Sequence, residues 1–290
     1  MNDVLALVGV AFVIGIVIGM TGMGGGALMT PALIFFGIPP ASAIANDLVA
    51  AAANKSVGAV VHWRDGSPDL RLAAWLMLGS VPTAFAGAYI IGLIGTTKTQ
   101  EDFLKSAIGA ALLLAALTYV VRLYVTAVRS SRGDTVEVLG VRPLPTVALG
   151  AFGGLVVGIT SVGSGSVIMV VLLLLYPTLT PRTLVGTDLV QAIPLVTSAA
   201  VSHVLVTGID WAVLIPLVLG GSPGTFLGAR LSSRVPQSAV RRGITLVLFL
   251  TGLIMLGVEP AIVLVVGAGL LVFGLPAWRV LTRRPRLQGR

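Results

Sequence analysis

The sequence predicts an all-α membrane protein, a polytopic helical bundle of two inverted repeats with short re-entrant or broken helices at two glycine clusters. Composition, the lengths of the apolar runs and an internal repeat lead to this fold class. Hydrophobic residues make up 56% of the 290 residues and charged residues 10%, against about 25% charged residues in a soluble domain. Because a soluble fold could not bury so much apolar surface, the composition excludes a soluble enzyme, a nucleic-acid-binding domain and a disordered protein.

The apolar runs have helix length, which predicts a chain of helices. A helix needs about 20 residues to cross the hydrocarbon core of a membrane. Two of the runs, 27–37 and 166–176, are about eleven residues long, and each follows a glycine cluster. We therefore expect two half-length helices at these places. The expected helices cover, in chain order, 4–20, 27–37, 41–62, 71–94, 103–125, 143–160, 166–176, 182–205, 210–230, 240–257 and 260–280.

An internal repeat relates the two halves of the chain. The offset is 139 residues near the glycine clusters and 141 residues further along. Aligned pairs include Gly19 with Gly158, Asp47 with Asp188, His62 with His203, Asp69 with Asp210, and Pro82 with Pro223. The expected organisation is a first inverted repeat at 1–125, a cytoplasmic linker at 126–142, a second inverted repeat at 143–257, and an extra C-terminal helix with a basic tail at 258–290.

Arginines predict the orientation of the repeats. They gather in the linker 126–142, in the loop near 230–242 and in the C-terminal tail, and basic loops remain in the cytoplasm. Each half holds five helical elements, which places the N-terminus outside and the C-terminus inside, with the two halves inverted. The net charge of +8 also favours contact with anionic membrane lipid. We therefore expect a multi-pass membrane protein.

The glycine clusters are candidates for a substrate site. Glycines before a short helix leave backbone N–H groups free at the positive end of the helix dipole, which favours an anion. The alternative is close helix packing through small residues. The candidate substrate-binding residues at the clusters are Thr21, Gly24, Gly25 and Gly26 in the first half, and Thr160, Ser161, Gly163, Ser164, Gly165 and Ser166 in the second.

Polar residues inside the apolar helices are candidates for ion coupling or for a pathway, because ionisable groups in a membrane are costly and usually pair or line a route. Lys55 is either a counter-charge for an anionic substrate or the ion-pair partner of an aspartate. The histidines are either proton relays or interfacial anchors and helix caps. Lys55 is grouped with the candidate substrate-binding residues. The candidates for ion coupling or a pathway are Asn46, Asp47, Asn54 and His62 in the first half, and Asp188, Gln191 and His203 in the second.

The segment Gly19-Met-Thr-Gly-Met-Gly-Gly-Gly26, followed by Pro31, and its repeat Gly158-Ile-Thr-Ser-Val-Gly-Ser-Gly165 resemble the sulfite exporter TauE/SafE family. The resemblance covers about residues 5–257. It implies a bacterial inner-membrane permease that exports small sulfur-containing anions such as sulfite, sulfoacetate and other organosulfonates. The second cluster departs from the first, since Gly-Ser-Gly replaces a triple glycine and Val170 stands where Pro31 stands.

The leading functional hypothesis is a secondary transporter of a small sulfur-containing anion. The chain has no cysteine and only two histidines, so we expect no cofactor and no metal. It shows no GxxxxGK[ST] nucleotide-binding motif, so gradients or a partner must drive transport, with protons as one candidate coupling ion. The alternatives are an anion channel on the same architecture and an intramembrane serine hydrolase that uses Ser164 and His203. We expect no nucleic-acid partner, and the sequence leaves the oligomeric state open.

Overall fold

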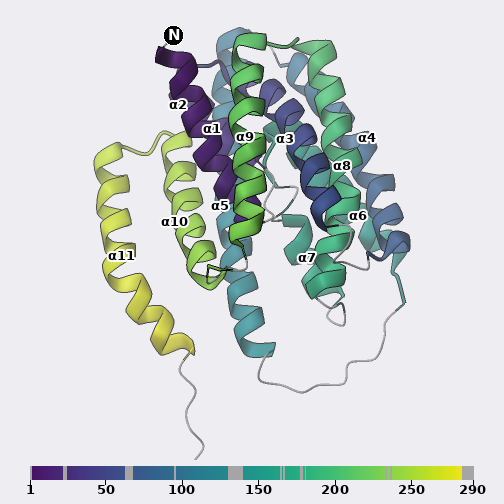
Figure 1. The fold of residues 1–290 in the computed structure, drawn as a ribbon, viewed down its shortest axis with the longest axis vertical. Coiled ribbons are helices and arrows are strands. Elements are labelled where there is room, and N and C mark those ends of the chain that lie inside the picture. The colour runs from purple at the N-terminus through teal and green to yellow at the C-terminus, as the bar shows by residue number, and fades with distance from the viewer. Residues whose placement is uncertain are drawn as a thin grey trace, which may run out of the picture.

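A computed structural model describes residues 2–21, 25–62, 68–94, 96–129, 140–163, 165, 167–176, 179, 181–232, 234–235 and 237–282. All regular structure in these ranges is helical (Figure 1). Each helix overlaps one of the expected apolar runs, so the all-helical class is confirmed. The helices are α1 (Asn2–Thr21), α2 (Gly26–Phe35), α3 (Pro40–His62), α4 (Leu70–Gly92), α5 (Thr97–Arg129), α6 (Pro143–Thr160), α7 (Val167–Leu175), α8 (Pro181–Val206), α9 (Trp211–Leu231), α10 (Gln237–Met255) and α11 (Pro260–Thr282).

Helix length separates two classes of element. In the described part of the chain, six helices are long and apolar enough to cross a membrane: α1, α4, α5, α6, α8 and α9. By contrast, α2 has 10 residues and α7 has 9. At a rise of about 1.5 Å per residue, each reaches about half of the roughly 30 Å hydrocarbon core. Their lengths match the two expected half-length helices, and their re-entrant course stays a prediction.

The starts of α4 and α9 repeat the same local structure. Asp69 caps α4, where its Oδ1 accepts a hydrogen bond from the backbone N–H of Leu72 at 3.0 Å. The aligned Asp210 caps α9 and accepts from the N–H of Ala212 at 3.0 Å. A side-chain oxygen at this position satisfies an N–H group that the helix itself leaves without a partner. The sequence repeat therefore extends to helix capping.

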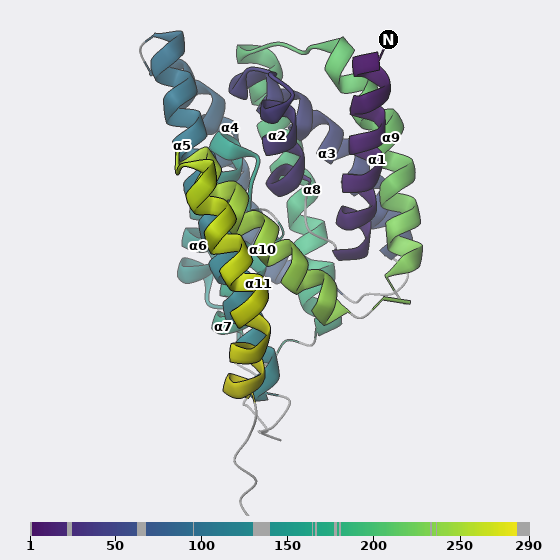
Figure 2. The same ribbon diagram turned by 90° about the vertical axis from the view of Figure 1, so that its left-hand side faces the viewer.

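The main helix contacts join the first half of the chain to the second. Helix α1 packs on α9, α4 packs on α6, and α5 packs on α10 (Figures 1 and 2). Helices α3 and α8 contact each other, and they also contact α9 and α4, respectively. If each helix is replaced by its counterpart in the other half, the α1–α9 contact becomes the α6–α4 contact, and the α3–α9 contact becomes the α8–α4 contact. The two halves thus share one core, with α11 packed against α10.

Glycines bring the paired backbones into direct contact. Gly19 of α1 lies against the backbone carbonyl of Thr225 in α9, and a Cβ atom there would overlap the carbonyl oxygen. Its aligned residue, Gly158 of α6, lies in the same way against the carbonyl of Ala84 in α4. Ala84 and Thr225 are themselves aligned at the 141-residue offset. Small residues permit this close approach of membrane helices, so equivalent residues form the two interfaces.

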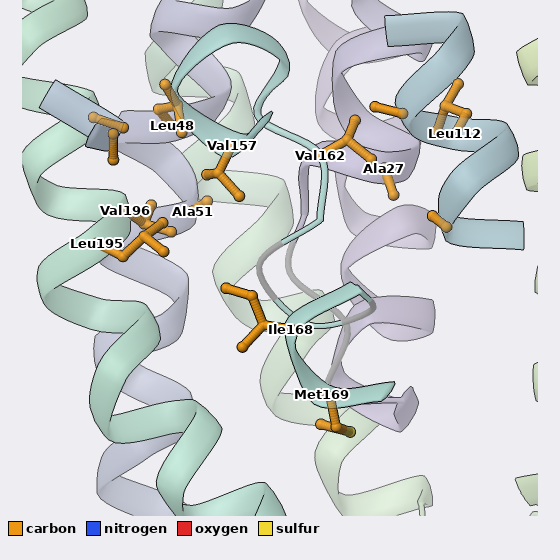
Figure 3. Close-up of a cluster of buried hydrophobic side chains, with 14 of the residues drawn as sticks. Ala27, Leu48, Ala51, Leu112, Val157, Val162, Ile168, Met169, Leu195 and Val196 are labelled. Carbon is orange, nitrogen blue, oxygen red and sulfur yellow. The ribbon is translucent and has the colours of Figure 1, made fainter. Parts of the chain in front are cut away.

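Apolar side chains from both halves fill the centre of the bundle around the ends of α2 and α7 (Figure 3). Gly25 and Gly26, at the start of α2, lie beside Asp47 of α3 and the Ser161 carbonyl. The apolar residues labelled in Figure 3 are Ala27, Leu48, Ala51, Leu112, Val157, Val162, Ile168, Met169, Leu195 and Val196.

The ends of the described chain lie on opposite sides of the bundle. The first turn of α1, marked N, is at one end, and the last turns of α5 and α11 are at the other (Figures 1 and 2). The expected topology needs this arrangement, because it places the N-terminus on one side of the membrane and both the linker and the C-terminus on the other. Which side is cytoplasmic stays a prediction.

Candidate substrate and coupling site

The carboxylate of Asp47 lies at the centre of the candidate site. It is in the first half of α3 and is 2% exposed. Its Oδ2 atom accepts two hydrogen bonds of 2.7 Å, one from Thr30 Oγ1 of α2 and one from Ser161 Oγ. Thr30 follows the first glycine cluster, and Ser161 belongs to the second. A single carboxylate oxygen therefore connects α2 to the second cluster.

The backbone at Ser161 turns sharply to make this connection. Ser161 is the C-cap of α6 and has φ = 61°, in the left-handed region, which costs a residue with a side chain roughly 1–2 kcal/mol. Gly163 follows at φ = 117°, in a range that favours glycine. The turn directs the hydroxyl of Ser161 to Asp47 and its carbonyl to α2.

Gly26 and Gly25 let the first turn of α2 approach this loop. The backbone of Gly26 packs directly on the carbonyl of Ser161, where a Cβ atom would overlap it. A Cβ atom on Gly25 would lie 3.3 Å from Asp47 Oδ1. Gly26 therefore fits close packing, the alternative to a substrate site. The same contacts place the N-terminus of α2 beside the Asp47 carboxylate. Gly165 is buried, while Gly24, Ser164 and Ser166 lie outside the described residues.

Thr21 and Thr160 use their hydroxyl protons within their own helices. Thr21 Oγ1 donates to the carbonyl of Val17 at 2.7 Å, and Thr160 Oγ1 donates to the carbonyl of Val156 at 2.6 Å. Threonine hydroxyls in helices often bond backward in this way. In this structure, neither donor points to the Asp47 carboxylate.

Lys55 lies two turns beyond Asp47 on α3 and is 9% exposed. The charges of Asp188 and Asp47 both act on it. Asp188, on α8, is 2% exposed, and its Oδ1 accepts a hydrogen bond from Gln191 Nε2 at 3.1 Å. The structure therefore brings Lys55 within electrostatic range of both aspartates that the sequence proposed as partners. Its role toward a substrate stays a prediction.

Two asparagines extend the polar groups along α3. Asn54 Oδ1 accepts a 2.6 Å hydrogen bond from Ser222 Oγ of α9. Asn46 Nδ2 donates to the carbonyl of Ser42 at 2.8 Å, and its Oδ1 atom is buried without a hydrogen-bond partner. Gln191 Oε1 is in the same situation. Buried oxygens without partners are rare and costly, so these two positions have acceptor capacity for water or another donor.

His203 is a buried histidine in the last turn of α8. It is 1% exposed, and its Nε2 atom donates to the carbonyl of Gly158 at 2.7 Å, while Nδ1 has no hydrogen-bond partner. The hydrolase hypothesis needs this imidazole beside Ser164, which lies outside the described residues. His62 ends α3, and its side chain is also outside them.

Sequence reasoning missed Thr30 and Ser222. Thr30 interrupts an apolar half-length helix, and Ser222 belongs to the Gly-Gly-Ser-Pro segment at 220–223. A hydroxyl at such a place usually bonds to its own helix, so the signal was weak. In the structure both hydroxyls reach a polar residue of α3.

A separate cavity of about 490 Å³ lies between α1, α2 and α10. Its walls are apolar apart from Thr251, which does not suit an anion. Elsewhere in the described part of the chain, no three His, Cys, Asp or Glu side chains gather to hold a metal. The cavity is lined by Ile14, Val17, Ala27, Leu28, Pro31, Ala32, Phe35, Val240, Gly243, Ile244, Val247 and Thr251.

Comparisons with known proteins fit this picture. The family model described as "Sulfite exporter TauE/SafE" matches residues 7–255. "Probable membrane transporter protein YjnA" of Bacillus subtilis (strain 168) is 33% identical over 242 residues, which cover 83% of this chain and 94% of that protein. "Probable membrane transporter protein YdhB" of the same organism is 25% identical over 85% of this chain and 98% of its own length. No solved structure matches.

Proposed function

This chain belongs to the sulfite exporter TauE/SafE family, and on that premise we propose that it is a secondary transporter that exports small sulfur-containing anions across the bacterial plasma membrane. Sulfite and organosulfonates such as sulfoacetate are the proposed substrates. The family's description supports the substrate class, and the names of the relatives support membrane transport. Protons are the proposed coupling ion, and the protein is not an enzyme.

The observation that carries this proposal is the group of buried charges where α3 meets α8. Asp47, Lys55 and Asp188 are each at most 9% exposed and lie inside a bundle with six candidate membrane spans. Ionisable residues inside a membrane are expensive and mark routes for ions and polar substrates. Beside them, α1 ends at Thr21 before α2 begins at Gly26, and Ser161 and Gly163 have positive φ, as expected where irregular backbone lines a path through a membrane protein.

The proposed anion site lies between the two glycine clusters. Backbone N–H groups at the start of α2, and at the start of α7, face the substrate, and Lys55 supplies a counter-charge. Each helix N-terminus adds roughly half a positive charge. The direct packing of Gly26 on Ser161 supports the placement, because it brings both clusters to one place. The hydroxyls of Thr30 and Ser161 both donate to Asp47.

The proposed topology consists of inverted repeats at 1–125 and 143–257, joined by a cytoplasmic linker at 126–142 and followed by a C-terminal helix and basic tail at 258–290. The N-terminus lies outside the cell and the C-terminus inside. The reciprocal pairs α1–α9 and α4–α6 support a two-fold relation between the halves. Inverted repeats around a midplane site are typical of secondary transporters.

Reconstitution of the full-length protein into liposomes tests the proposed function. Uptake and binding are measured for sulfite, sulfoacetate, taurine, sulfate and thiosulfate, with carboxylates of similar size as the matched series. We expect saturable flux of a sulfur anion that responds to an opposing proton gradient. Equal flux of the carboxylates would contradict the substrate class. Flux that does not saturate and ignores the proton gradient would favour the anion channel instead.

A further inference from the structure

The buried charges at the centre of the bundle do not balance. Among the buried side chains that the structure describes, two carboxylates, Asp47 and Asp188, lie with one ammonium, Lys55. His203 donates from Nε2 to a backbone carbonyl, and its buried Nδ1 atom has no partner that could accept a second proton, which favours the neutral imidazole. If every acid and base in this group were ionised, one negative charge would remain inside a membrane, where an unpaired charge is very costly. A proton on one carboxylate removes it.

The partners of Asp188 favour its ionised form. Gln191 presents an amide N–H group to Asp188 Oδ1, and the charge of Lys55 acts on the same carboxylate. An ammonium group donates hydrogen bonds and cannot accept one, and the Gln191 nitrogen is also only a donor. These two neighbours of Asp188 thus present a donor N–H group and a positive charge, and both favour its ionised form.

The partners of Asp47 accommodate either form. Thr30 and Ser161 both use hydroxyls, and a hydroxyl can donate to a carboxylate or accept from a protonated carboxyl by rotating its own proton. Asp47 can therefore take up a proton without losing its hydrogen-bonded neighbours.

Among the described residues, the other elements around Asp47 add no group that competes for this role. Thr30 of α2 and Ser161 at the end of α6 are uncharged, and the charge that acts on Asp47 is that of Lys55 on its own helix. From α8, Asp188 acts on Lys55. His203 of α8 is bonded to α6.

We infer that Asp47 is the carboxyl group that carries the coupled proton and that its protonation opens the anion site. The coupling part of this inference rests on the transport function proposed above. A proton from the aqueous phase binds the carboxylate, and the new O–H group donates to the hydroxyl oxygen of Ser161 or Thr30. The hydroxyl protons are then free to point to an oxygen of the substrate anion. When the anion leaves, they return to Asp47 and its proton goes back to water.

Infrared difference spectroscopy of the full-length protein in lipid tests the protonated residue directly. On acidification we expect the C=O stretch of one buried protonated carboxyl. The band should be absent from Asp47→Asn and present in Asp188→Asn, the matched control at the aligned position. A band that survives in Asp47→Asn, or that only Asp188→Asn removes, would overturn the inference, as would a wild-type spectrum without it.

A second variant keeps the carboxyl and changes only its partners. In Thr30→Val with Ser161→Ala, we expect the band to persist and to move to higher frequency, because a C=O group that loses hydrogen bonds vibrates faster. An unchanged frequency would show that the protonated group does not face these hydroxyls. This readout decides the question even if Asp47→Asn does not fold.

Flux in liposomes that contain a pH-sensitive dye tests the coupling. For the wild type, we expect anion and protons to move together. In Asp47→Asn, no protons should accompany the sulfoacetate that crosses the membrane, because the carboxyl group that binds them is gone. Proton movement that persists with the anion in this variant would overturn the inference. If the wild type moves no sulfur anion, the proposed function fails, and the infrared band still decides whether Asp47 takes up the proton.

Discussion

Asp47 and Asp188 occupy aligned positions in the two halves, and both are 2% exposed, yet their surroundings differ. Asp47 receives hydrogen bonds from hydroxyls on two other parts of the chain, Thr30 and Ser161. Asp188 receives one from an amide that lies one turn further along its own helix, and it lies within range of the Lys55 charge. The repeat thus places a carboxylate in each half but does not repeat its partners.

The sequence explains why the partners differ. Met169 stands at the position aligned with Thr30, and Val196 stands at the one aligned with Lys55. Neither can offer what its counterpart does, because methionine and valine carry no hydrogen-bond donor. The two halves can therefore share one backbone fold while the carboxylate of one half binds a proton and that of the other stays ionised.

The largest effect is expected from Lys55→Ala. Removal of the ammonium leaves two buried carboxylates without their cation, which should lower the free energy of unfolding by about 3–5 kcal/mol. Denaturant or thermal unfolding in detergent measures it, with exposed Lys98→Ala as the control. Adding Asp188→Asn to Lys55→Ala should recover part of the loss. A stable Lys55→Ala that no longer binds anion would instead identify Lys55 as a substrate counter-charge only.

Thr30→Val should act on the Asp47 side alone. The change keeps the shape of the side chain and removes one hydrogen bond to a buried carboxylate, which contributes about 1.5–3 kcal/mol. Thr118→Val is the matched control, because that buried hydroxyl donates to Ala115 of its own helix. Unfolding measured on both should show the larger loss for Thr30→Val. Equal losses would mean that the hydrogen bond to Asp47 contributes no more stability than the hydrogen bond of Thr118 within its own helix.

Gly26→Ala tests the backbone contact that brings Ser161 to Asp47. The new methyl group would overlap the Ser161 carbonyl, so we expect a loss of about 1–3 kcal/mol from overpacking together with loss of anion binding. Gly9→Ala, in α1, is the control, since nothing lies within 4 Å of its added Cβ. Full anion affinity in a folded Gly26→Ala protein would place the substrate site elsewhere.

The smallest effect is expected from Gln191→Leu, on the Asp188 side. The change removes one hydrogen bond to Asp188, but it also removes a buried amide oxygen that has no partner. The two effects are of similar size and opposite sign, so the free energy of unfolding should change by less than about 1 kcal/mol. A loss as large as that of Thr30→Val would show that Asp188 depends on Gln191 as much as Asp47 depends on its hydroxyls.

The helices were predictable because their signal is local. Run length and polarity located all of the described helices, including the short α2 and α7, and the capping aspartates Asp69 and Asp210 follow from the aligned sequence. The position of Asp47, Lys55 and Asp188 in apolar helices also predicted a buried polar group, and all three are buried; their role in transport stays a prediction. These properties depend on residues close together in the chain.

The contacts of Asp47 were not predictable, because they join residues far apart in the sequence. Ser161 reaches Asp47 only through the left-handed turn at its own backbone and the close packing of Gly26. Thr30 gave no signal that distinguishes it from Thr21, whose hydroxyl bonds within its own helix. Sequence patterns report the periodicity of one helix and not the choice that a hydroxyl makes among distant acceptors.

The backbone contact between Gly19 and Thr225 has a consequence for biosynthesis. These residues are about 200 positions apart, so α1 enters the membrane long before its partner α9 exists. At about 5–20 residues per second, α1 waits on the order of 10–40 s with its glycine face open to lipid or to the insertion machinery. Helix α4 waits for a shorter time, because α6 follows it more closely. The first half therefore cannot complete its packing while it is synthesised. If the ribosome stalls before α9 is made, the glycine face of α1 stays exposed to quality-control proteases.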